Sequence, residues 1–171
     1  MPPRDIRDYI SDDNDRLDGI FRVFRDFKGG KAKTTRDLLH ALMAGIDRHI
    51  QWEEKILFPI LENRMGLSDR GPTSAMREEH RKMEGLLKEI HEQVLKNGTA
   101  AADPERELIG LLGRHHQKGE ETFYPMLDHS LSETEKMEAY TRMKTIVLEK
   151  ENRCCPGPAD ARMEDRTKED R

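Results

Sequence analysis

Apolar residues recur every three to four positions through most of the chain, a spacing typical of amphipathic α-helices. The pattern predicts helices over residues 6–28, 35–64, 72–96 and 104–129. Gly29-Gly30 and Asn97-Gly98 end the first and third, since glycine readily takes the backbone conformation that closes a helix. Four long helices with short connections predict an all-α fold, an up-down antiparallel four-helix bundle.

A fifth helix is predicted after the four. Ser132 and Glu135 have the spacing of a capping box, in which each residue satisfies a backbone N–H of the other, and the helix should run to about residue 151. The bundle therefore carries an additional C-terminal helix, and residues 1–150 form one domain. Residues 151–171 are charged and broken by proline and glycine, so we expect a disordered tail there.

Pro59 and Pro125 lie inside the second and fourth predicted helices. An interior proline costs a helix about 3 kcal/mol, because it removes one backbone hydrogen bond and crowds the preceding turn. Each proline should therefore kink its helix or mark where the regular part ends.

Composition narrows the function classes. The chain has 171 residues, 35% hydrophobic and 37% charged, and a formal net charge of −4 with acids and bases interspersed. This balance argues against a nucleic-acid surface or an anionic membrane as partner. No apolar run approaches the ~20 residues that span a bilayer, and the first sixteen residues lack the apolar stretch of a signal peptide. We expect a cytoplasmic protein.

The chain repeats itself at an offset of 66 residues, and the repeat shows which positions could form a site. Arg48-His49 aligns with Arg114-His115, and Phe58-Pro59-Ile60-Leu61-Glu62 aligns with Tyr124-Pro125-Met126-Leu127-Asp128. The register holds throughout, since 49 − 14 = 35 and 115 − 80 = 35. Two helical hairpins related by a pseudo-twofold axis explain this pattern.

Histidines and acids fall on the repeat among inward-facing positions. Glu53 follows His49 by four residues, and Glu84 follows His80 by four, which puts each pair about 40° apart on one helix face. One such pair could be an ordinary buried hydrogen bond, but several on one register favour a metal. Buried carboxylates cost several kcal/mol unless a cation compensates them, and helical bundles hold di-iron sites in this way. His40 is predicted to lie on the surface, and His91 and His129 on the surface or at helix ends.

Three motifs carry a resemblance to a known family: HIQWEEKILFPILE from residue 49, EEHRKMEGLL from residue 78 and HHQKGEETFYPMLD from residue 115. With them the chain resembles the hemerythrin-like (HHE cation-binding) domains over about residues 8–130. The resemblance implies a non-haem di-iron centre that meets O₂, NO or peroxide. The family's ligands fall on His49, Glu53, His80 and His115, with Glu84 as an optional ligand. The resemblance also implies that the chain binds one or two iron ions, with manganese or zinc as alternative metals.

Two positions depart from the family pattern. Asn14 stands where the first helix should offer a histidine, and Gly119 stands where the fourth should offer a carboxylate four residues after His115. Asn14 can still present a carbonyl oxygen, or Asp13 or Asp15 could reach inward. Glu120 comes one residue late, and a π-bulge near Gly119 would bring it back. Alternatively, His116 and Glu120, which are four residues apart, form the ligand pair of this helix.

These departures predict an asymmetric centre. The pocket of the third and fourth helices keeps His80, Glu84 and His115, whereas the other keeps only His49 and Glu53, so the second metal should be weak or absent. The residues favour a binding or sensing protein, or one acting in iron homeostasis, over a dedicated enzyme.

Two other functions stay open. One is a di-iron oxidoreductase or repair enzyme, to which Cys154 and Cys155 could add redox groups. The other is a structural or signalling bundle that has lost its metal, which Asn14 and Gly119 would favour.

Overall fold

The computed structural model describes residues 5–27, 30–66 and 71–151 of the chain. The described part is helical and contains no strand, so the all-α class is confirmed. The elements in chain order are α1 (Ile6–Phe27), α2 (Ala32–Trp52), η1 (Glu53–Leu57), α3 (Phe58–Met65), α4 (Pro72–Asn97), α5 (Ala102–Lys118), η2 (Gly119–Phe123), α6 (Tyr124–Ser130) and α7 (Glu133–Glu151). Here η marks a π-helical turn.

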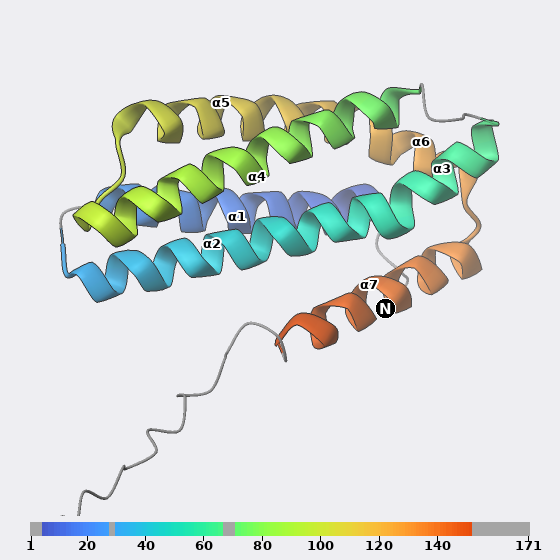
Figure 1. Cartoon of the computed structure of the whole chain (residues 1–171). Helices are drawn as coiled ribbons and strands as arrows, with labels where there is room; N and C mark the ends of the chain where they lie inside the picture. Colours follow the sequence, from blue (N-terminus) through green and yellow to red (C-terminus); the bar gives the residue numbers. More distant parts are fainter. Residues whose placement is uncertain (1–4, 28–29, 67–70, 152–171) are drawn as a thin grey trace, which may run out of the picture.

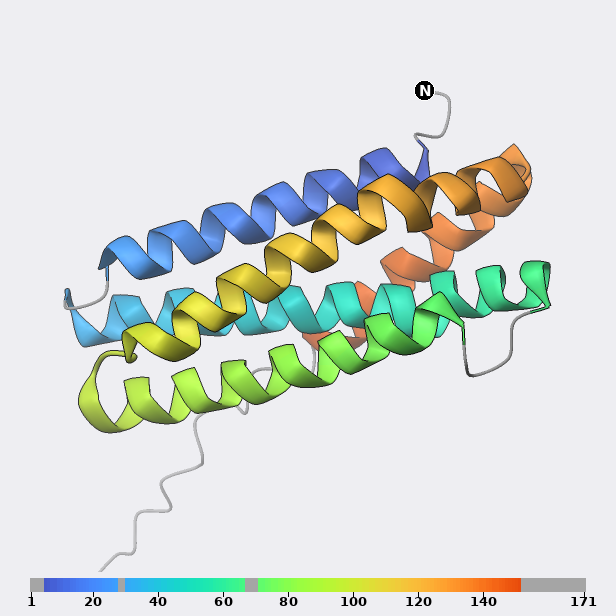
Figure 2. The same ribbon diagram turned by 90° about the horizontal axis from the view of Figure 1, so that it is seen from above.

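Four long rods make up the body of the molecule. They are α1, the continuous run α2–η1–α3, α4, and the continuous run α5–η2–α6 (Figures 1 and 2). The rods pack along one another, with α1 against α2, α4 against α5 and α2 against α4. Helix α7 lies outside them, against α2 and η1. None of the described helices is both long enough and apolar enough to cross a membrane.

The expected prolines mark changes of helix type. Pro59 and Pro125 are the second residues of α3 and α6, and each follows a π turn within a continuous rod. Pro59 cannot donate to the carbonyl of Lys55, and the Arg142 guanidinium of α7 donates to that carbonyl instead, at 3.3 Å. The regular α-helix is therefore interrupted by a π turn before each proline. Of the two expectations, a kink or the end of the regular part, the structure shows the second.

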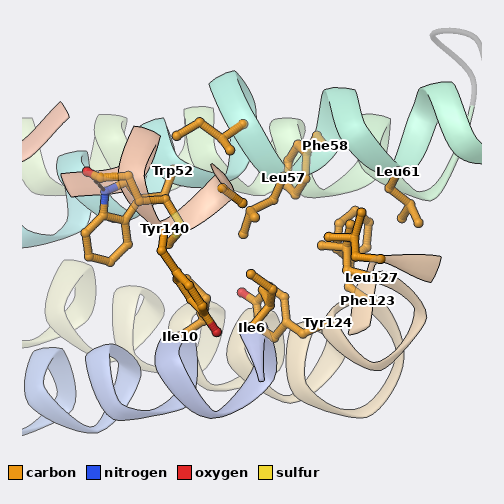
Figure 3. Packing of buried hydrophobic residues seen from close by; sticks show 14 of the residues in the cluster. Ile6, Ile10, Trp52, Leu57, Phe58, Leu61, Phe123, Tyr124, Leu127 and Tyr140 are labelled. Carbon is orange, nitrogen blue, oxygen red and sulfur yellow. Dashed lines mark hydrogen bonds between the residues drawn. The ribbon is translucent and has the colours of Figure 1, made fainter. Parts of the chain in front are cut away.

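The apolar core is split into two clusters. One fills the end of the bundle where α3, α6 and α7 meet and includes Ile10, Trp52, Phe58 and Tyr124 (Figure 3). The other fills the opposite end and contains side chains from α1, α2, α4 and α5, such as Leu17. Between these two clusters every rod carries buried polar residues, which are described below.

The start of α7 has the predicted capping box. The Ser132 backbone N–H donates to Glu135 Oε2 at 2.9 Å, and the Glu135 N–H donates to Ser132 Oγ at 3.4 Å. The predicted tail, residues 151–171, lies outside the described residues apart from the helix end at Glu151, as do Cys154 and Cys155.

Trp52 fastens α7 to the bundle. Its indole Nε1–H donates to the Met143 carbonyl at 2.9 Å, and its ring lies 5.5 Å from that of Tyr9, which in turn lies 5.2 Å from Tyr140 of α7. The side chain is buried. Trp52 thus contributes a buried hydrogen bond and aromatic contacts to the attachment of α7, which ion pairs such as that of Lys136 with Asp5 also support.

Replacing Trp52 with Phe should therefore loosen α7. The loss of a buried hydrogen bond and part of a ring should lower the free energy of unfolding by about 1–2 kcal/mol. Hydrogen exchange should show faster exchange of α7 amides than of α4 amides. An Arg142→Ala control removes only an exposed bond and should change α7 exchange less. Equal exchange in wild type and Trp52→Phe would contradict this role.

Candidate metal centre

The two π turns follow the internal repeat. They begin at Glu53 and Gly119, which are 66 residues apart, each four residues after a histidine. Each turn closes with an i to i+5 bond, from the Phe58 N–H to the Glu53 carbonyl and from the Tyr124 N–H to the Gly119 carbonyl. The π turn considered near Gly119 is present. Its mate in the second rod was not predicted, although the repeat register could have indicated it.

A buried polar layer lies between the two apolar clusters. It consists of side chains from all four rods, namely Asp13, Asn14, His49, Glu53, His80, His115 and His116. On each rod the polar positions stand between apolar ones, as in α4, where Met76 and Met83 flank His80. The helices are therefore anchored on both sides of the layer by ordinary core packing.

Glu53 occupies the middle of the layer and is fully buried. His80 Nε2 lies 2.8 Å and His115 Nε2 lies 3.1 Å from its Oε2 atom, and His49 Nε2 lies 3.8 Å from the same oxygen. Tyr124 donates its hydroxyl proton to the other oxygen, Oε1, at 2.6 Å. Three imidazoles from three rods thus converge on one carboxylate oxygen.

Each of these imidazoles also faces a second, outer carboxylate through Nδ1. His80 Nδ1 lies 2.7 Å from Glu54 Oε1, and His115 Nδ1 lies 3.1 Å from Glu79 Oε2. His49 Nδ1 lies 3.3 Å from Asp13 Oδ2. An outer carboxylate of this kind fixes the tautomer, because it accepts the Nδ1–H and leaves Nε2 free as a ligand.

The space between the three Nε2 atoms and the Glu53 carboxylate is therefore suited to a positive charge. A neutral imidazole that donates from Nδ1 presents a lone pair at Nε2, and that lone pair would face the Glu53 oxygen. His80 Nε2 and His115 Nε2 are also only 3.3 Å apart. Either extra protons or a cation must lie between these atoms, so the donor set fits a metal ion.

The pKa values show how the protein balances this charge. Burial opposes ionisation of Glu53, but the charge and hydrogen bonds of His115, together with His80, hold the pKa of Glu53 well below its usual value. Burial likewise lowers the pKa of His49. For His115, burial is outweighed by Glu53 and Glu79, which raise its pKa. A proton on His115 can thus neutralise Glu53 when no cation is bound.

Two outer groups are shifted as well. Burial opposes ionisation of Asp13, yet its hydrogen bond to His49 and the charge of Arg48 lower its pKa to about 2. Burial raises the pKa of Tyr124 well above its usual value, and the neighbouring Glu53 raises it further. Asp13 is therefore a carboxylate and Tyr124 a neutral hydrogen-bond donor at ordinary pH.

Asn14, Glu120 and His116 form a second polar group beside the first. Asn14 Nδ2 donates to Glu120 Oε1 at 2.8 Å, and the Ser11 hydroxyl donates to the same oxygen at 3.0 Å. Asn14 Oδ1 and His116 Nε2 are buried and have no hydrogen-bond partner among the residues that the structure describes. The His116 ring lies 6.0 Å from that of His49. These three residues line an open cavity of about 370 Å³ between α1 and α5.

Glu84 is exposed and therefore lies outside both polar groups. At 100° per residue, the buried positions of α4 extend from about 80° on one side of His80 to about 20° on the other. Glu84 lies about 40° round on that second, narrow side, so the helix turns it to solvent. A spacing of four places two residues on one face, but it does not centre both on the buried stripe.

Sequence reasoning missed the outer carboxylates Glu54 and Glu79 and the role of Tyr124. Glu54 and Glu79 each stand next to a predicted position in the sequence, Glu53 and His80, and adjacent residues on a helix normally point apart. Asp13 was considered as an inner ligand, and it contacts His49 from outside instead. Asp15 is exposed.

Comparison with known families agrees with this donor set. The sequence model of the hemerythrin HHE cation-binding domain matches residues 5–127. The chain belongs to this family. Searches of curated proteins and of solved structures give no match. Within this hemerythrin-family domain, His49, Glu53 and His115 offer ligand atoms that all lie within 4.8 Å of one another, so the cluster could hold a metal ion.

Gly119 makes the tyrosine contact possible. A Cβ atom added there would lie 2.8 Å from the Tyr124 hydroxyl oxygen and 2.7 Å from a ring carbon. The phenol therefore passes over bare backbone to reach Glu53. This packing explains why glycine occupies position 119, the position that corresponds to Glu53 in the repeat.

A Gly119→Ala substitution should consequently displace Tyr124 and destabilise the fold by about 1–3 kcal/mol, the usual cost of overpacking. Gly113→Ala is the matched control. Gly113 lies on the same rod, and a Cβ atom added there meets no other described atom within 4 Å. It should stabilise the helix by about 0.5–1 kcal/mol through helix propensity. Chemical denaturation measures both, and equal effects in the same direction would refute the proposed packing.

Proposed function

We propose that this hemerythrin-family protein binds iron in its core through His49, Glu53, His80 and His115. The observation that carries the proposal is the convergence of three Nε2 atoms on one buried carboxylate oxygen, with each Nδ1 held by an outer carboxylate. Imidazole and carboxylate ligands together suit iron, and zinc and manganese are the alternative ions that metal analysis would reveal.

The proposed activity is binding or sensing of O₂, NO or peroxide, or a part in iron homeostasis. Iron, when bound, would supply a redox-active centre with an open position for such a ligand. The chain's own residues orient the ligands and keep the site dry: Glu53 and its histidines are buried, and Tyr124 donates a hydrogen bond to Glu53. Family membership and the short connections support an up-down order of the four rods. The proposal keeps a cytoplasmic location on sequence grounds.

A second metal position would involve Asn14, His116 and Glu120. Two of its buried atoms, Asn14 Oδ1 and His116 Nε2, have no partner in the described part of the chain. An amide oxygen is a neutral, weak ligand, and Glu120 is already an acceptor for two hydrogen bonds. We therefore propose an asymmetric centre, in which the position of His49, Glu53, His80 and His115 is filled first.

This asymmetry predicts one tightly held metal per chain. Protein purified from iron-replete cells should keep about one equivalent after mild chelation, as measured by plasma emission spectroscopy. Asn14→His introduces the imidazole that the family resemblance implies, and it should raise the retained metal toward two equivalents. Two equivalents already retained by wild type would contradict the asymmetry.

The outer carboxylates should set the affinity of the site. Glu79→Ala removes the partner of His115 Nδ1 and should weaken metal binding about 10–100-fold, the usual effect of such a loss. Glu84→Ala, on the same helix but exposed, is the matched control and should leave binding unchanged. Competition with a calibrated chelator measures both affinities. A larger loss in Glu84→Ala than in Glu79→Ala would restore Glu84 as the ligand.

One observation favours a competing function, a structural or signalling bundle without metal. Glu53 and a protonated His115 form an ion pair that is self-compensating. Chelation distinguishes the two proposals, because an ion that binds only the folded state raises its stability. The melting temperature should fall when the purified protein is stripped of metal and recover when iron returns. No change would favour the metal-free bundle.

A further inference from the structure

Two histidines meet on the surface, away from the core cluster. His40 of α2 is exposed, and His91 of α4 is half-buried. Their Nε2 atoms lie 3.3 Å apart and their ring centroids 5.3 Å apart. His40 stands nine residues from His49 and His91 eleven from His80, or about 14 and 16 Å along the helices. This pair is therefore separate from the candidate metal centre.

The separation of the two nitrogens fits a shared metal ion. Imidazole nitrogens bind Zn²⁺ at about 2.0–2.1 Å, and two of them at a tetrahedral angle lie about 3.3 Å apart. A direct N–H···N hydrogen bond, in which one ring donates and the other accepts, is the other reading of this distance. Water also competes for exposed donors, so a hydrogen bond gives little reason for the rings to stay together.

The backbone under both rings is held in place. Leu39 precedes His40 and Ile90 precedes His91, and both apolar side chains are fully buried in the same cluster. That cluster packs α2 against α4. The two imidazoles are thus presented by rigid helix interiors, which lowers the ordering cost of binding one ion between them.

We propose that His40 and His91 form a surface site for one divalent transition metal ion of the class that prefers imidazole, with Zn²⁺ as the representative. Water molecules complete the coordination. The bound ion links α2 to α4 across the face of the bundle. This inference does not depend on the core centre or on its metal.

Zinc titration of the iron-loaded, tag-free protein tests the site. Calorimetry on wild type, His40→Gln, His91→Gln and the double variant should show a zinc-binding step that either single substitution weakens at least tenfold. The double variant should lose no more than a single one, because both side chains serve one ion. His129→Gln, which removes another exposed histidine, is the matched control and should bind zinc as wild type does.

The outcomes separate this site from the core. Iron content should be equal in all variants, so a loss of core metal cannot imitate the result. Wild-type zinc affinity in either single variant would overturn the proposal, and so would losses that add in the double variant, since they would indicate independent surface histidines.

Discussion

The buried carboxylate of Glu53 is the constraint on which the rest of the centre depends. An uncompensated charge there would cost several kcal/mol, and compensation comes from the two rods α4 and α5–η2–α6. His80 and His115 approach one oxygen, and Tyr124 donates to the other. The outer carboxylates then hold the histidines in the orientation that this inner contact needs. Each imidazole is therefore held between the Glu53 carboxylate and an outer carboxylate.

The two halves of the repeat have diverged around this carboxylate. The first half provides Glu53 and an apolar Phe58, whereas the second provides Gly119 and Tyr124 at the same register. Only bare backbone at Gly119 lets the phenol reach Glu53, so the two differences depend on each other. Asn14, in place of a histidine, supports Glu120 by hydrogen bonding. The first half thus carries the buried charge of Glu53, and the second half carries Tyr124, which donates a hydrogen bond to it.

The helices, their ends and the polar layer could be predicted from the sequence, because helix periodicity and the repeat report local spacing. The exposure of Glu84 shows the limit of this spacing, because a spacing of four shows that two residues share a helix face without locating the centre of the buried stripe. The π turn at Glu53 and the outer contacts of Glu54 and Glu79 depend on how neighbouring rods pack. Contacts such as that of His40 with His91 join distant parts of the chain, and periodicity within one helix carries no information about them.

The division of the core explains why such a costly polar layer is compatible with a stable fold. Buried histidines and acids contribute little net stability, since their desolvation offsets most of their attraction. The free energy of folding must therefore come from the apolar clusters on either side, which pack the rods independently of the layer. Under this arrangement a polar position that does not contact Glu53 can vary while the apolar clusters still hold the helix. Asn14 lies between Ile10 and Leu17, one in each cluster, so a substitution there changes the polar layer while the helix stays in place.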